Sequence, residues 1–165
     1  MKGYIFCPYC ASELKTIIQE NKPFKHCSEC SWTHYPTPHI AVAGVIISDN
    51  KVVMVKRNRE PFKDTWMFPA GFLEFGEHPE QTLFREVREE TGLRVVDWDL
   101  MEIIQSTSDP RSPKHLVLFY KAKAIGEIKN NDQDENSRVE WKSLDEDIEI
   151  GFPHHKVIFH KLKDR

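Results

Sequence analysis

The stretch GFLEFGEHPEQTLFREVREETGL, residues 71–93, decides how this chain folds and what chemistry it supports. Its second half predicts a helix over residues 79–91 with a defined start and end. Pro79 suits the first turn of a helix, where its missing N–H costs nothing. Gly92 suits the left-handed residue that commonly ends a helix.

The predicted helix carries a group of acidic side chains on one side. At about 100° per residue, Glu86, Glu89 and Glu90 fall within an arc of roughly 100°. Crowded carboxylates repel one another unless a cation lies among them, and sites made only of oxygen ligands select Mg²⁺ or Mn²⁺. Arg85 can reach Glu89 at i+4, and Glu77, just before the helix, can point toward the same ion. The alternative for any such run is a solvated acidic helix face.

The rest of the chain after residue 38 predicts strands and one more helix. Apolar residues flank the turn at residues 48–50, which is typical of a hairpin. A final helix should follow Pro153. Expected strands lie at residues 40–47, 51–55, 66–69, 72–73, 100–106, 116–124 and 139–141, and most of residues 127–149 should form a solvated connection. Strands interleaved with helices indicate an α/β fold with a mixed sheet.

The four cysteines predict a metal site in a separate N-terminal module. They form two C-x-x-C pairs with sixteen residues between them. We expect no export signal in the chain, and in that setting this spacing indicates a tetrahedral Zn²⁺ site instead of disulfides. The zinc ligands would be Cys7, Cys10, Cys27 and Cys30. The module, residues 1–36, has too little apolar material to fold without such a staple.

Composition narrows the class of protein. The chain has 165 residues, of which 39% are hydrophobic, enough for one real core. The formal net charge is −3 and the pI is about 6.2, so no basic excess indicates a nucleic-acid partner. The longest apolar run has the length of a strand, which argues against a membrane span and favours a cytoplasmic protein.

Residues 71–93 match the Nudix box, G-x5-E-x7-R-E-U-x-E-E-x-G-U, at all seven fixed and both aliphatic positions. The chain thus resembles the Nudix hydrolases, whose fold is an α/β/α sandwich, and residues 37–165 would form this domain. The resemblance implies hydrolysis of a phosphoanhydride in a nucleoside diphosphate linked to another group. Glu86, Glu89 and Glu90 would bind catalytic Mg²⁺ or Mn²⁺ with the Gly71 carbonyl, and Glu77 and Arg85 would orient them.

The combination of a four-cysteine ribbon and a Nudix domain is similar to the NADH pyrophosphatase branch. That branch carries S-Q-P-W-P-F-P-x-S after the box, whereas residues 105–113 here contain no aromatic residue. Pro110 lies near a proline found in similar ADP-ribose enzymes, so ADP-ribose is the first expectation and NADH the second. A homodimer is common among such enzymes. The rival hypothesis is a non-catalytic module that senses nucleotides or binds nucleic acid, but all four box glutamates are present.

Several residues outside the box are weaker candidates, each with a plain alternative. Glu135 matches a loop glutamate that serves as an extra ligand or base in many family members, or it is one more acid in an acidic loop. Arg57 could contact phosphate or end a strand in solvent. Trp66 and Phe68 could stack on a base, although aromatic residues in strands usually belong to the core. His154 and His155 could approach the site or lie on the surface at a helix start.

Overall fold

Contacts along the backbone divide the chain after Thr37 into two units, Met1–Thr37 and Pro38–Arg165. This division lies one residue beyond the boundary expected from the sequence. The computed structural model describes residues 4–110, 112 and 114–164. Within them, no helix is long and apolar enough to cross a membrane.

The first unit is a small antiparallel sheet of three strands. These are β1 (Lys15–Gln19), β2 (Lys22–His26) and β3 (Thr33–His34), in the order β1-β2-β3. Its buried apolar residues are Cys7, Leu14 and Cys27, with Trp32 packed against them. So few apolar side chains fit the expectation that this unit depends on a metal for its stability.

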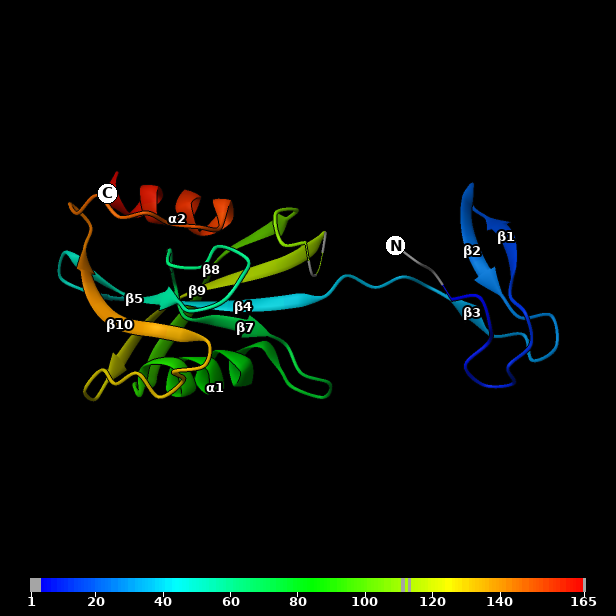
Figure 1. Cartoon of the computed structure of the whole chain (residues 1–165), viewed down its shortest axis with the longest axis horizontal. Helices are drawn as coiled ribbons and strands as arrows, with labels where there is room; N and C mark the ends of the chain where they lie inside the picture. The colour runs from blue at the N-terminus through cyan, green and yellow to red at the C-terminus, as the bar shows by residue number, and fades with distance from the viewer. Residues whose placement is uncertain (1–3, 111, 113, 165) are drawn as a thin grey trace. The chain divides into compact units, whose positions relative to one another are not determined.

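The second unit is built on a mixed sheet of seven strands (Figure 1). Five of them follow the order β10-β5-β4-β9-β8, while β6 pairs with β5 and β7 with β4. The central pair, β4 and β9, is parallel, and the other pairs are antiparallel. The strands are β4 (Ile40–Ser48), β5 (Lys51–Arg57), β6 (Trp66–Met67), β7 (Ala70–Phe72), β8 (Arg94–Ser106), β9 (His115–Ile125) and β10 (Asn136–Ser143).

Two helices, α1 (Pro79–Thr91) and α2 (Pro153–Lys163), cover opposite faces of this sheet in the described part of the chain (Figure 1). Alternation along β4 explains the two faces, because successive side chains of a strand point to opposite sides. Ala43 and its alternate neighbours belong to the core cluster that includes Ile158 of α2. Val42 belongs to the cluster that includes Val87 of α1. The expected α/β/α sandwich is confirmed.

Helix α1 begins and ends at the residues predicted from the sequence. Pro79 occupies its first turn, and the side chain of Gln81 accepts the His78 N–H at 2.7 Å. Gly92 follows with φ 74°, and its N–H donates to the Arg88 carbonyl at 3.0 Å. The helix therefore holds its acidic residues at fixed positions relative to β7.

Strand ends were predicted less well than helix ends. Strand β8 starts at Arg94, six residues before the expected start. Strand β10 spans Asn136–Ser143, so part of the expected acidic connection is paired with β5. In both places charged residues interrupt the apolar pattern, and pairing with a neighbouring strand decides the extent of the strand.

Candidate metal centre and active site

The four cysteine side chains converge on one point in the N-terminal unit. Their sulfur atoms all lie within 4.8 Å of one another. The Cys7–Cys30, Cys10–Cys27 and Cys10–Cys30 sulfur pairs are 3.5, 3.4 and 3.7 Å apart. A disulfide would be ~2.05 Å long, whereas a Zn²⁺ tetrahedron with ~2.3 Å bonds has edges of ~3.8 Å. These side chains therefore fit a Cys₄ zinc site.

The backbone places the two pairs of thiols in the same way. The Cys7 N–H donates to the Ser12 carbonyl, and the Cys27 N–H donates to the Trp32 carbonyl, both at 2.8 Å. The residue after each pair has a left-handed backbone, with φ 59° at Ala11 and 61° at Ser31. Two matching turns thus aim two sulfur atoms each at a common centre.

We propose that this centre holds zinc, and we expect about one zinc ion per chain in purified protein. Elemental analysis of untagged protein measures this. Cys27→Ser removes a buried ligand and should lower the zinc content and unfold the N-terminal unit. Ser28→Ala, a substitution in the same turn that removes no thiol, is the matched control. A metal-free protein whose N-terminal unit stays folded would contradict the proposal.

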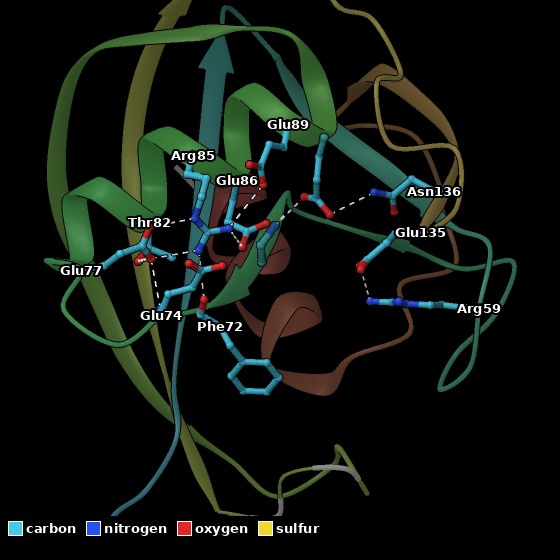
Figure 2. Close-up of polar contacts among 12 residues, drawn as sticks. Arg59, Phe72, Glu74, Glu77, Thr82, Arg85, Glu86, Glu89, Glu135 and Asn136 are labelled. Carbon is cyan, nitrogen blue, oxygen red and sulfur yellow. Dashed lines mark hydrogen bonds and ion pairs between the residues drawn. The ribbon is translucent and has the colours of Figure 1, made fainter.

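In the second unit, Arg85 organises the carboxylates of the box (Figure 2). Its Nε and Nη2 atoms donate to the two oxygens of Glu77 at 2.8 and 3.0 Å. Its Nη1 atom donates to Glu86 at 2.6 Å and to Glu89 at 3.3 Å. Through its hydrogen bonds, Arg85 lowers the pKa of Glu77 to about 2. The predicted orienting role of Arg85 and Glu77 is consistent with this geometry.

Glu86 lies directly against the backbone of β7. A Cβ atom added to Gly71 would meet Glu86 Oε1 at 1.9 Å and its carboxyl carbon at 2.2 Å. Burial raises the pKa of Glu86. The Arg85 guanidinium lowers this pKa, but it offsets only part of the rise. The absence of a side chain at residue 71 therefore leaves the space in which this carboxylate sits.

Glu90 is placed differently from the other two glutamates of the helix. It is 4% exposed, and its two oxygens accept hydrogen bonds from the Ala70 N–H at 2.8 Å and the Asn136 amide at 3.0 Å. Burial raises its pKa to about 8, and the negative charge of Glu86 contributes in the same direction. Glu86 and Glu89 line a cavity beside the box, whereas Glu90 does not. The sequence did not distinguish these environments.

Glu135 comes from the loop before β10 and also lines the cavity. Its carboxylate pairs with Arg59, from the loop after β5 (Figure 2). Its charge also raises the pKa of Glu86 and Glu90, so it lies within electrostatic reach of both. Arg59 has no motif around it, and the sequence did not single it out.

This cavity has a volume of about 390 Å³ and joins the box to α2. Arg57 lines it but is 5% exposed, and its guanidinium donates to the Pro61 and Arg59 carbonyls. Trp66 and Phe68 are 8% and 0% exposed and belong to the core, away from the cavity lining. Their packing inside the sandwich favours the alternative given for these two rings, that they belong to the core.

Three histidines also line the same cavity. Two of them were weaker candidates in the sequence analysis, and the third was not a candidate there. His154 and His155 lie in the first turn of α2, and His115 is the first residue of β9. All three are at least nine-tenths buried. The expectation of surface histidines at a helix start is thus wrong. Their placement follows from long-range packing, which leaves no local pattern in the sequence.

The acidic residues at the cavity fit a hard divalent cation. Glu86 presents oxygen ligands beside the Gly71 backbone, and Arg85 bridges the carboxylates of Glu86 and Glu89, offsetting part of their mutual repulsion. The raised pKa values of Glu86 and Glu90 reflect burial and crowding, which a cation would relieve. When bound, Mg²⁺ or Mn²⁺ would neutralise phosphate charge and lower the pKa of water.

Comparison with known families agrees with the fold and the motif. The family model described as NUDIX domain matches residues 37–162. The chain therefore belongs to the Nudix family, whose hydrolases are pyrophosphohydrolases that act on nucleotide substrates and typically use divalent cations.

Two curated relatives share much of this chain. The ADP-ribose pyrophosphatase of Methanocaldococcus jannaschii is 35% identical over 125 residues, which cover 75% of this chain and 73% of that protein. The NAD-capped RNA hydrolase NudC of Vibrio atlanticus is 31% identical over 139 residues, which cover 82% of this chain. They cover only 48% of that protein, so the chain spans about half of its length.

Solved structures show the same architecture. A NUDIX hydrolase from Nitrosomonas europaea aligns with a TM-score of 0.78 at 26% identity and covers 98% of this chain and 92% of that one. The NUDIX domain of Shewanella oneidensis NrtR, solved with ADP ribose, aligns with a TM-score of 0.69 at 23% identity. It covers 79% of this chain and 90% of that one. At that identity the likeness concerns the fold alone.

Proposed function

We propose that this Nudix pyrophosphohydrolase cleaves the phosphoanhydride of an adenine nucleoside diphosphate linked to a sugar, with ADP-ribose as the preferred substrate. The observation that carries the proposal is the arginine-organised group of carboxylates on α1, which opens onto a cavity long enough to reach α2 (Figure 2). Hydrolysis would add water across the P–O–P linkage and release AMP and ribose 5-phosphate.

The residues of the box would share the work. Glu86 and Glu89, with the Gly71 carbonyl, would hold Mg²⁺ or Mn²⁺ beside the diphosphate. Glu90 would complete the site, and its hydrogen bonds to Ala70 and Asn136 would keep it in place. Glu135 would serve as an additional ligand or as the base that takes the proton of the attacking water. Its partner Arg59, at the same cavity, would meet substrate phosphate.

Two features bear on the choice of substrate. The likeness to an ADP-ribose pyrophosphatase extends over about three quarters of both chains, which favours ADP-ribose. The cysteine cluster and the likeness to NudC favour NADH or another NAD-linked substrate as the second candidate. Residues 105–113 contain no aromatic residue of the kind found in the NADH branch, so we rank NADH second.

We expect kcat/KM for ADP-ribose to exceed that for nucleoside triphosphates by at least about tenfold, a difference of ~1.4 kcal/mol in transition-state binding. The physical reason is that the cavity has room for a group beyond the diphosphate. A screen of nucleoside diphosphate derivatives with Mg²⁺ and with Mn²⁺ measures this, with AMP identified by chromatography.

The screen contains NADH and nucleoside triphosphates as comparison substrates. If the protein turns NADH over faster than ADP-ribose, NADH becomes the first candidate substrate. If it turns nucleoside triphosphates over far faster than both ADP-ribose and NADH, the proposed substrate class is wrong.

A further inference from the structure

Part of the cavity wall is built from histidine and phenylalanine rings, with the Arg57 guanidinium 5.2 Å from the centre of the Phe152 ring. His115, His154 and His155 are 3%, 7% and 2% exposed, and all three line the cavity. The Phe72 ring lies 5.5 Å from His115, and the Phe152 ring lies 5.4 Å from His154. The box chemistry described above uses none of these rings.

Hydrogen bonds to the backbone fix which atoms two of these histidines present. The Phe68 N–H donates to Nδ1 of His155 at 3.1 Å, so the ring proton of His155 is on Nε2, a donor. Nδ1 of His115 lies 2.6 Å from the Ser112 carbonyl, which can only accept, so Nδ1 carries the proton. In the neutral ring of His115, Nε2 is then an acceptor. The two rings thus offer a donor on His155 and, in the neutral form of His115, an acceptor.

His154 is buried without a hydrogen bond. Its contacts within the described chain are ring contacts with His115, Phe119, Phe152 and His155, and neither ring nitrogen has a partner there. Neither nitrogen is fully enclosed, since among the described residues only Asn130 Oδ1 is both fully enclosed and unpaired, so a ligand in the cavity can reach His154. Burial lowers the pKa of His154 to about 4, the nearby His115 acts in the same direction, and the carboxylate of Asp109 at the same cavity acts against them. This ring is therefore neutral near pH 7 and suited to an uncharged ligand.

We propose that His154, together with the Nε2 atoms of His115 and His155, recognises the adenine base of the substrate. The proposal rests on the proposed function, because it concerns the same cavity. Adenine has flat faces for the ring wall, and its edge carries an acceptor, N7, beside a donor, the 6-amino group. Those two groups complement the Nε2 donor of His155 and an Nε2 acceptor on His115. A ribose has no aromatic face for these rings to contact.

The test uses His154→Phe in the full chain, which keeps a ring against Phe152 and removes both nitrogens. For ADP-ribose we expect KM to rise about tenfold with kcat changed by no more than about twofold, since a base contact is the same in ground and transition states. An analogue whose adenine is replaced by hydrogen should show no such change. His160→Phe is the matched control, because His160 is exposed on the same helix and lies outside the cavity lining.

A binding measurement on the wild-type chain separates this inference from the proposed function. Calorimetry should show AMP binding at least about tenfold more tightly than ribose 5-phosphate, whether or not ADP-ribose is hydrolysed. Two results would overturn the inference: equal binding of these two phosphates, or an equal KM change for ADP-ribose and its abasic analogue in His154→Phe. Absence of ADP-ribose hydrolysis alongside preferential AMP binding would reject only the proposed substrate.

Discussion

Glu89→Gln should lower kcat by about 10²–10⁴-fold, or ~3–5 kcal/mol of barrier, while the fold stays intact. The carboxylate of Glu89 lines the cavity, its side chain is 57% exposed, and it forms an ion pair with Arg85 at 3.3 Å. Gln keeps the shape of the side chain and removes the negative charge that would hold a divalent cation. Steady-state kinetics at saturating Mg²⁺ and a far-UV spectrum measure the two effects separately.

The neighbouring glutamates make the result specific. Glu86→Gln and Glu90→Gln should lower kcat to a similar degree, and Glu135→Gln should lower it less. Glu80→Gln is the control, because Glu80 lies in the first turn of α1 and outside the cavity lining. A chelator should abolish activity, and added Mg²⁺ or Mn²⁺ should restore it. Near wild-type turnover of both Glu86→Gln and Glu89→Gln would favour the rival hypothesis of a non-catalytic sensor.

Local patterns in the sequence were enough to predict the elements whose ends are set by residues close together in the chain. Helix α1 was predicted to the residue, because a proline and a glycine mark its two ends. The hairpin of β4 and β5 was predicted from its turn residues, and the convergence of the cysteines from their spacing. The limits of β8 and β10 depend on pairing with β9 and β5, which no local pattern records.

The residues of the candidate site also fall into two groups, those that local patterns predict and those that depend on long-range contacts. The acidic residues of α1 and Arg85 could be recognised together because helical periodicity puts them on one side. The burial of Glu90 could not, since it depends on Ala70 and Asn136, which come from β7 and β10. Likewise, β9 and α2 supply the histidines of the cavity wall, and only the fold brings His115 to Phe72 and His154 to His115. Such contacts between distant segments are the part that a single sequence leaves open.

Gly71 connects the motif to the geometry of the site. The φ angle of Gly71 lies outside the left-handed region, so this position does not need the backbone freedom of glycine. What it needs is space, because an added Cβ would lie 1.9 Å from Glu86 Oε1 and 2.6 Å from Oε2. Contacts this short cannot be kept, and the flexible carboxylate would move before the backbone of β7 does. The fixed glycine of the box thus protects the position of Glu86.

Gly71→Ala should therefore lower kcat about as much as Glu86→Gln, by about 10²-fold or more, with the free energy of unfolding changed by no more than ~1 kcal/mol. The double variant Gly71→Ala/Glu86→Gln should be no slower than the slower single variant, because both changes act on the same carboxylate. Kinetics and urea unfolding of the three variants measure this cycle.

Gly76→Ala supplies the opposite pattern on the same segment. Gly76 has φ 88°, and an added Cβ would meet nothing within 4 Å, so alanine there strains the backbone without touching the site. We expect it to destabilise the fold by ~1–2 kcal/mol and to leave kcat near the wild-type value. If Gly71→Ala instead lost stability and kept its turnover, the glycine would serve the strand alone. If Gly71→Ala lowers kcat without lowering stability, and Gly76→Ala lowers stability without lowering kcat, then glycine is needed at residue 71 to leave space for Glu86.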